Sequence, residues 1–204
     1  MRIEVRHDTI YRYQAPPRSI VQLLRLTPPS FETQHVRNWR IDIGTDAVVR
    51  QGSDAFGNCV HRLYADLQQT ELAISVIGDV DVEDSAGVVR GTEEPLPPQM
   101  FLRTTPLTSP DTTLSAFAQD ATAGCGAPLE RLHALLCAVH AHMAFDTRVT
   151  DSATSAAQAF GQSAGVCQDF AHIFIAAARC LGIPARYVSG HLHRSDGLID
   201  QDAA

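Results

Sequence analysis

The residues with the clearest potential for chemistry lie in one short segment, Gly165-Val-Cys-Gln-Asp-Phe-Ala-His172. Cys167 falls in the first turn of the helix that this segment predicts. Unpaired backbone N–H groups and the positive end of the helix dipole favour a nucleophilic thiolate there. The same N–H groups can bind the oxyanion of a tetrahedral intermediate. The pattern therefore leaves two interpretations equally open, namely attack by Cys167 on a carbonyl carbon and a small buried core cysteine.

The neighbours of Cys167 suggest how the site is built. Gly165 has no side chain, so we expect a substrate to approach the thiol closely. Asp169 is placed to cap the helix, and orienting a substrate or a loop is its alternative role. His172 follows Cys167 by five positions, which displaces it by ~140° around the helix. We therefore expect His172 to pack in the core rather than to activate the thiol.

The other histidines and cysteines predict no metal site. His191 and His193 share one face of a predicted strand, and such a pair can bind a metal ion. No third ligand has clear spacing, so we expect solvated histidines, and a metal site is the alternative. No Cys-x-x-Cys pair is present, which disfavours structural zinc, and no acidic calcium loop is evident. We expect Cys137 and Cys180 in helix cores. The remaining helical histidines are predicted on the polar side of their helix: His133, His140 and His142.

The second half of the chain reads as helical and must position this segment. Ser109 and Pro110 predict the N-cap and first position of a helix that ends near Gly124. A second helix is predicted from about Pro128, from its apolar spacing. We predict the remaining elements as helices at residues 154–160 and 165–181 and a strand at residues 185–192.

The first hundred residues read as β-structure. Period-2 patterns predict strands near residues 3–6, 20–26 and 36–43, with a hairpin around Asp54-Ala-Phe-Gly-Asn58. Residues 71–82 are predicted as one long strand or as a bulged pair of strands. Regular strand spacing without helices favours an antiparallel sandwich. Residues 91–110 contain five prolines and predict a linker.

Composition excludes several classes of protein. The 204 residues are 45% hydrophobic, which supports a folded chain, and the net charge of −7 disfavours nucleic-acid binding. No apolar run is long enough for a membrane span, and the N-terminus lacks the pattern of a signal peptide. An odd count of five cysteines favours free thiols in a reducing compartment, so we expect a cytoplasmic protein.

Residues 165–192, GVCQDFAHIFIAAARCLGIPARYVSGHL, resemble the core signature of the bacterial transglutaminase-like superfamily. The first half is similar to the β domain that precedes this core in many bacterial members, through His7-Asp-Thr-Ile-Tyr-Arg-Tyr13 and the Asp54 turn. The resemblance implies a papain-like core with a Cys-His-Asp triad, in which Cys167 is the nucleophile. The implied chemistry is attack on an amide carbonyl, an acyl-enzyme, and transfer to water or an amine.

The sequence departs from the family at its end. Members carry the triad histidine in a strand after the hairpin that follows Tyr-Val-Ser-Gly, and the aspartate on the next strand. The chain stops at Ala204 without either block. We therefore expect the triad His and Asp beyond Ala204, which makes this chain an inactive fragment of a longer enzyme. The alternative is a non-catalytic binding or scaffold module with a vestigial core.

Together these observations predict an α+β protein. Residues 1–105 form an N-terminal antiparallel β-sandwich domain, and residues 106–204 form a truncated papain-like, transglutaminase-like core. The predicted function is a cysteine hydrolase or acyltransferase (protease, amidase or transglutaminase) that acts on protein or peptide amides through Cys167. No cofactor, metal, nucleic acid or membrane is predicted as a partner. The missing strands would leave residues 185–192 with an open edge, which predicts self-association there.

Overall fold

The computed structural model describes residues 1–66 and 69–191. The chain divides into two compact units, Met1–Leu96 together with Gly190 and His191, and Pro97–Ser189. The sequence had placed this boundary between residues 105 and 106. The difference arises because the second part of the predicted linker forms two 3₁₀ turns, Pro98–Leu102 and Pro106–Thr108, which are bound to the helical unit.

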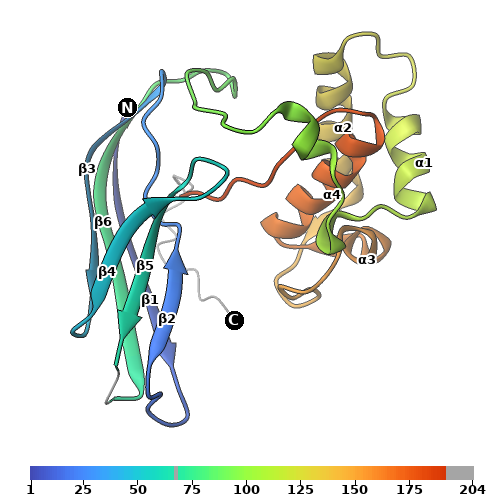
Figure 1. Cartoon of the computed structure of the whole chain (residues 1–204). Coiled ribbons are helices and arrows are strands. Elements are labelled where there is room, and N and C mark those ends of the chain that lie inside the picture. The colour runs from blue at the N-terminus through green and yellow to red at the C-terminus, as the bar shows by residue number, and fades with distance from the viewer. Residues whose placement is uncertain (67–68, 192–204) are drawn as a thin grey trace. The chain divides into compact units, whose positions relative to one another are not determined.

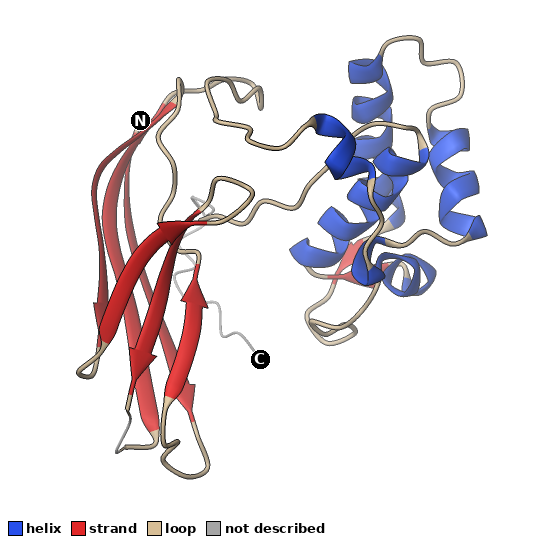
Figure 2. Cartoon of the chain, in the orientation of Figure 1, coloured by secondary structure: helices blue, strands red, loops and turns tan. Residues whose placement is uncertain are grey.

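The first unit consists of antiparallel sheets in its described residues (Figures 1 and 2). One sheet has the order β1-β6-β3 and the other β2-β5-β4. The alternation of a half-buried strand is clearest in β6, where Leu72, Ile74 and Val76 are buried and the residues between them are partly exposed. The strands are β1 Arg2–Arg12, β2 Ile20–Leu24, β3 Gln34–Ile43, β4 Val48–Ser53, β5 Cys59–Ala65 and β6 Glu71–Val82.

Apolar side chains from both sheets form one core in the first unit. Ile20, Leu24 and Leu63 come from the β2-β5-β4 sheet, and Leu72 and Ile74 come from β6 of the other sheet. Leu63 and Leu72 are fully buried. Of the two predictions for residues 71–82, the long single strand is correct, and it pairs with β1 on one side and β3 on the other.

The predicted hairpin around Asp54 is confirmed as the turn between β4 and β5. The Asp54 carboxylate accepts hydrogen bonds from Asn58, from the Arg25 guanidinium and from the backbone N–H of Phe56. These bonds hold the pKa of Asp54 well below its usual range, those from the Asn58 and Arg25 side chains most strongly. Gly57 has φ +79°, a conformation that a side chain disfavours.

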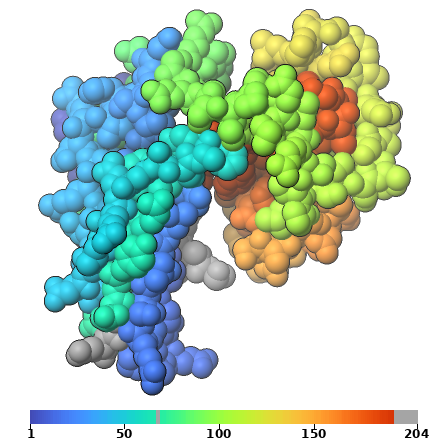
Figure 3. All heavy atoms as spheres, viewed as in Figure 1, coloured from blue at the N-terminus to red at the C-terminus, as the bar shows by residue number. Residues whose placement is uncertain are grey.

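The second unit is a small helical bundle (Figure 1). Its central helix α4 contacts the other three helices, and Ile173, Ala176 and Ala177 of α4 are fully buried. In the space-filling view, yellow-green, yellow and orange atoms, which belong to the region of α1, α2 and α3, form much of the visible surface of the helical unit (Figure 3). The elements are α1 Thr112–Ala121, α2 Pro128–His142, β7 Ala144–Phe145, α3 Ala156–Gln162, β8 Ala164–Gly165 and α4 Cys167–Cys180.

The ends of several helices differ from the sequence prediction, since α3 covers Ala156–Gln162 rather than residues 154–160 and α4 covers Cys167–Cys180 rather than residues 165–181. Asp111, rather than Ser109, caps α1, because its carboxylate accepts the N–H of Leu114 at 2.7 Å. Helix α2 begins at Pro128 as predicted. Helix α4 is followed by Gly182 with φ +72°, as predicted for its C-terminus. None of the helices in residues 1–66 and 69–191 is long and apolar enough to cross a membrane.

The predicted strand at residues 185–192 is wrong for the part that the structure describes, because residues 185–191 form no strand. The backbone of Ala185 is instead engaged with other segments. Its N–H donates to Phe101 O at 3.2 Å, and its carbonyl accepts two N–H groups of Arg179. An alternating pattern becomes a strand only beside a partner strand. Self-association through this edge therefore stays a prediction.

Candidate active site

Cys167 is the first residue of α4, and its side chain is exposed. Val166 precedes it as the N-cap, with the extended backbone that starts a helix. The predicted placement of the thiol at a helix N-terminus therefore holds, and the alternative of a buried core cysteine does not. An exposed thiol at this position is accessible to a carbonyl group in solution.

Two backbone N–H groups beside the thiol have no acceptor among the described residues. The N–H groups of Asp169 and Phe170 both donate to Val166 O, at 2.9 and 3.2 Å. No such bond is made by the N–H groups of Cys167 and Gln168 within residues 1–66 and 69–191. These two donors, together with the positive end of the α4 dipole, can stabilise negative charge that develops close to the thiol.

Asp169 is almost completely buried, with 1% of its surface exposed. Its Oδ2 accepts the N–H of Val166 at 2.8 Å, which is the capping role that the sequence predicted. The same oxygen accepts the hydroxyl of Thr150 at 2.6 Å. Its Oδ1 is buried and has no hydrogen-bond partner within the described chain. The sequence contained no signal for Thr150, which lies in an irregular loop 19 positions before Asp169.

Gly165 has a different role from the one predicted. It is buried, and a Cβ atom built there would lie 2.5 Å from Asp169 Oδ2 and 2.9 Å from Asp169 Cβ. The missing side chain therefore leaves space for the Asp169 carboxylate and does not open a path for substrate. Gly165 also belongs to β8, which pairs in parallel with β7 and was not predicted. Through this pairing the N–H of Asp146 donates to Gly165 O at 3.0 Å.

His172 lies in the core, as predicted. It is buried, and its ring packs against Tyr187 with the ring centroids 5.5 Å apart. Burial lowers the pKa of His172, and the charge of Asp169 opposes this in part. Its Nδ1 has no hydrogen-bond partner within the described residues. No histidine in this part of the chain is hydrogen-bonded to Cys167, so the described residues supply no base for the thiol.

The remaining histidines divide between surface and interior. His133 and His140 are exposed on α2, as predicted. His142 was expected on the same polar side but is half-buried, because its ring stacks on Phe160 at 4.1 Å and its Nε2 is 2.9 Å from Phe160 O. The contact with the Phe160 ring of α3 therefore buries part of His142, although the polarity pattern of α2 alone places this residue on the polar side. Sequence alone does not reveal that contact.

The predicted histidine pair lies partly outside the described residues, since His193 is not among them. The ring of His191 lies 5.4 Å from that of His7 and 6.0 Å from that of Trp39. Burial, and to a lesser degree the charge of His7, lowers the pKa of His191. Within residues 1–66 and 69–191, no three His, Cys, Asp or Glu side chains are arranged to hold a metal ion.

All five cysteines are unpaired thiols. Cys137 was predicted in a helix core, which is wrong, because its side chain is exposed on α2. Cys180 is half-buried against the helical core. Cys137 and Cys167 are thus the two exposed thiols, and the half-buried ones are Cys59, Cys125 and Cys180. Exposure alone therefore does not distinguish Cys167; its place at the start of a helix does.

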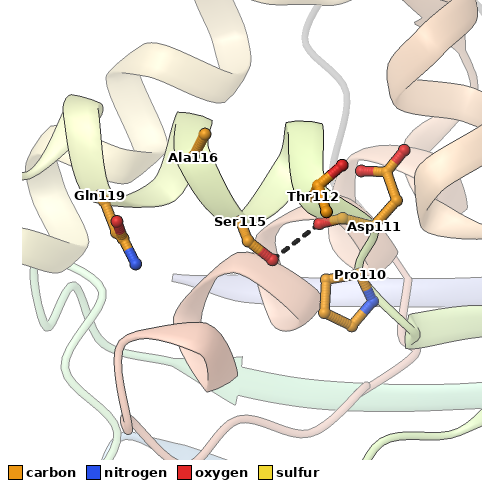
Figure 4. A pocket seen from close by; sticks show the side chains of 6 residues that line it. All are labelled: Pro110, Asp111, Thr112, Ser115, Ala116 and Gln119. Atoms are coloured by element: carbon orange, nitrogen blue, oxygen red, sulfur yellow. Dashed lines mark hydrogen bonds between the residues drawn. The ribbon is translucent and has the colours of Figure 1, made fainter.

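Two depressions lie on the surface of the helical unit. One, of about 690 Å³, borders the start of α1, where the Ser115 hydroxyl donates to Asp111 O (Figure 4). None of its lining residues is a cysteine or histidine. The other, of about 370 Å³, is mainly apolar and lies between α2, α4 and residues 186–188. Phe170 and Phe174 line it, on the side of α4 that also carries Cys167.

This chain is similar to known proteins in sequence and in fold. The chain is 29% identical over 213 residues to the uncharacterized protein ML0607 of Mycobacterium leprae (strain TN), over 97% of this chain and 74% of that protein. It also resembles in fold a solved structure titled a "Putative Cysteine Protease" from Cytophaga hutchinsonii, with a TM-score of 0.71 and 21% identity. That match covers 90% of this chain but 65% of the solved chain, so this chain spans about two thirds of its length.

Two family models match, one on each half of the chain. Residues 3–81 match the bacterial transglutaminase-like N-terminal region, and residues 115–203 match the transglutaminase-like superfamily. The fold is mixed α+β, with antiparallel sheets followed by a helical core that resembles the papain-like arrangement of the solved neighbour. With the two matched regions in this order, the chain belongs to the transglutaminase-like superfamily.

Proposed function

We propose that this chain is the nucleophile-bearing part of a cysteine enzyme that attacks amide carbonyls through Cys167. The observation that carries the proposal is an exposed thiol at the first residue of α4, next to two N–H groups without an acceptor in the described chain. The helix dipole favours the thiolate by about 0.3–1 kcal/mol. This contribution is modest, so efficient attack also requires a general base.

The reaction would follow two steps. The base takes the thiol proton, and the Cys167 sulfur bonds to the carbonyl carbon of the amide while the N–H groups of Cys167 and Gln168 bind the oxyanion. The C–N bond then breaks, and the amine leaves with the proton held by the base. In the second step, water or a primary amine attacks the thioester and gives its proton to the base, and the thiol is released after reprotonation. Water gives an acid, as in a protease or amidase, and an amine gives a new amide.

We further propose that the triad histidine and aspartate are supplied by residues beyond Ala204 in a longer protein. Two features support this. The described part of the chain provides no imidazole to Cys167, and the side chains of Leu136 and Val188 at the apolar depression are 58% and 73% exposed. An apolar surface of this kind is normally covered. The 204-residue chain alone would then have little activity.

The five free thiols fit the cytoplasmic location that we propose.

A binding or scaffold module with a vestigial Cys167 is the second candidate. It is favoured by the lack of a base for the thiol within the described residues. The gene sequence beyond codon 204 separates the two candidates. A continuation with a histidine-bearing strand and then an aspartate supports the enzyme, whereas a stop codon after Ala204 supports the module.

Thiol reactivity in the full-length protein tests the enzyme directly. Iodoacetamide at neutral pH should alkylate Cys167 far faster than Cys137, which is also exposed but lies on the surface of α2 away from a helix N-terminus. Peptide mass spectrometry reports both rates from one sample. Equal rates at the two sites would contradict an activated nucleophile.

Product analysis then identifies the reaction. The full-length protein is incubated with peptide amides, with and without a primary amine, and the products are identified by mass spectrometry. New carboxylates indicate hydrolysis and amine adducts indicate acyl transfer. The Cys167→Ser variant should form neither product, and the Cys137→Ser variant should form both at the normal rate.

A further inference from the structure

The stretch that carries Cys167 is anchored on both sides to one loop, residues 146–154. Two positions before the thiol, Gly165 O accepts the N–H of Asp146 at 3.0 Å. Two positions after it, Asp169 Oδ2 accepts the hydroxyl of Thr150 at 2.6 Å. Cys167 therefore lies at the middle of a short segment that is held at both ends, while its own side chain stays exposed.

The second anchor goes beyond ordinary helix capping. Capping of α4 requires only the bond from the Val166 N–H to Asp169, which is present at 2.8 Å. The bond from Thr150 adds a connection to a distant segment, and it is made by a carboxylate with 1% of its surface exposed. Gly165 is the residue that leaves room for this carboxylate. Thr150, Gly165 and Asp169 thus contribute to one buried contact, which helix capping alone does not require.

We propose that Thr150 and Asp169 are positioning residues that hold the first turn of α4, and with it the Cys167 thiol, against the loop of residues 146–154. The proposal rests on the proposed function, because it assigns these residues to the reactivity of Cys167. Neither residue takes part in bond making. Their contact fixes the first turn of α4. The N–H groups of Cys167 and Gln168 and the helix dipole then stay in place to stabilise a thiolate.

Removal of the Thr150 hydroxyl should loosen one of the two anchors. Thr150→Val keeps the shape of the side chain but has no donor for Asp169. The first turn of α4 then frays, and the stabilisation of the thiolate falls. Because the dipole contributes a factor of about two to five, we expect Cys167 alkylation at neutral pH to slow by about two- to five-fold.

The chain offers a matched control in the same loop. The Thr154 hydroxyl bonds to Asp151 within the loop, at 3.0 Å, and not to α4. Thr154→Val therefore removes an equivalent hydroxyl without touching the Asp169 contact. Thr150→Ser keeps a hydroxyl at the critical position and should restore most of the wild-type profile. Cys137 serves as the internal reference thiol in every sample.

The experiment measures iodoacetamide alkylation of the 204-residue chain against pH, with amide hydrogen exchange of peptides that cover residues 146–154 and 164–170. The proposal is supported if Thr150→Val slows Cys167 relative to Cys137 and speeds exchange in both peptides, while Thr154→Val leaves Cys167 unchanged. It is overturned if exchange rises but the Cys167 profile does not move, since the contact is then only structural. It is also overturned if both variants shift Cys167 equally.

These outcomes can be told apart from failure of the proposed function. If wild-type Cys167 and Cys137 share one pH profile, the thiol is not activated and the enzyme proposal fails. If wild-type Cys167 reacts faster than Cys137 but Thr150→Val leaves its rate unchanged, only the positioning proposal is overturned.

Discussion

Gly165→Ala is the substitution with the clearest structural consequence near the site. Gly165 has no positive φ, so alanine can adopt its backbone conformation. The added Cβ, however, would lie 2.5 Å from Asp169 Oδ2 and 2.9 Å from Asp169 Cβ and Cγ. The Cβ of Asp169 is fixed to the backbone and cannot rotate away. Either the first turn of α4 moves, or the carboxylate leaves its place and loses its bonds to Thr150 and Val166.

Both responses are costly. Overpacking of a buried site costs about 1–3 kcal/mol, and loss of a hydrogen bond to a charged group costs about 1.5–3 kcal/mol. We therefore expect Gly165→Ala to destabilise the helical unit by about 2–4 kcal/mol. For a unit of this size that lowers the Tm by roughly 10–20 °C.

Gly161 provides the control for this prediction. It lies in α3, and a Cβ atom built there meets nothing within 4 Å. Gly161→Ala should therefore stabilise the helix by about 0.5–1 kcal/mol, through the lower helix propensity of glycine alone. Thermal melting followed by helical circular dichroism measures both variants, since the helices of the described chain lie in the second unit. A Gly165→Ala melting temperature equal to that of wild type would refute the steric argument.

Two further substitutions probe the core around α4. Arg179 donates to Phe101 O at 2.8 Å and to Ala185 O at 2.7 and 3.1 Å. Lysine cannot reproduce this planar set of donors, so Arg179→Lys should lower the free energy of unfolding by about 2–4 kcal/mol. Arg131→Lys, which alters a single bond of 3.3 Å, should change chemical-denaturation midpoints by much less, and similar losses would contradict this. Burial lowers the pKa of His172 below its ordinary value of 6.5, so the unfolded chain takes up its proton first and stability falls as the pH drops below that value. His172→Leu should flatten urea-midpoint profiles between about pH 7 and 5, and an unchanged slope would show that His172 does not titrate in this window.

Local patterns in the sequence correctly predicted much of the fold. The start of α2 at Pro128, the β-structure at residues 71–82 and the Asp54 hairpin each depend on interactions between residues close in sequence. The N-cap of α1 was predicted two positions early, at Ser109, because Asp111 is an equally good cap and only the backbone path decides between them. The strand at residues 185–191 failed because a strand depends on a neighbour that the described chain does not place there.

In the candidate site, too, some features follow from the local sequence and others from tertiary contacts. The sequence by itself determined that Cys167 begins a helix and that Asp169 caps it, because both follow from the few residues at one helix start. Only the tertiary structure decided that Gly165 is a space for a buried carboxylate and that Thr150 reaches it from a remote loop. Such contacts join segments whose separation in sequence carries no periodic signal, so they become visible only once the chain has packed.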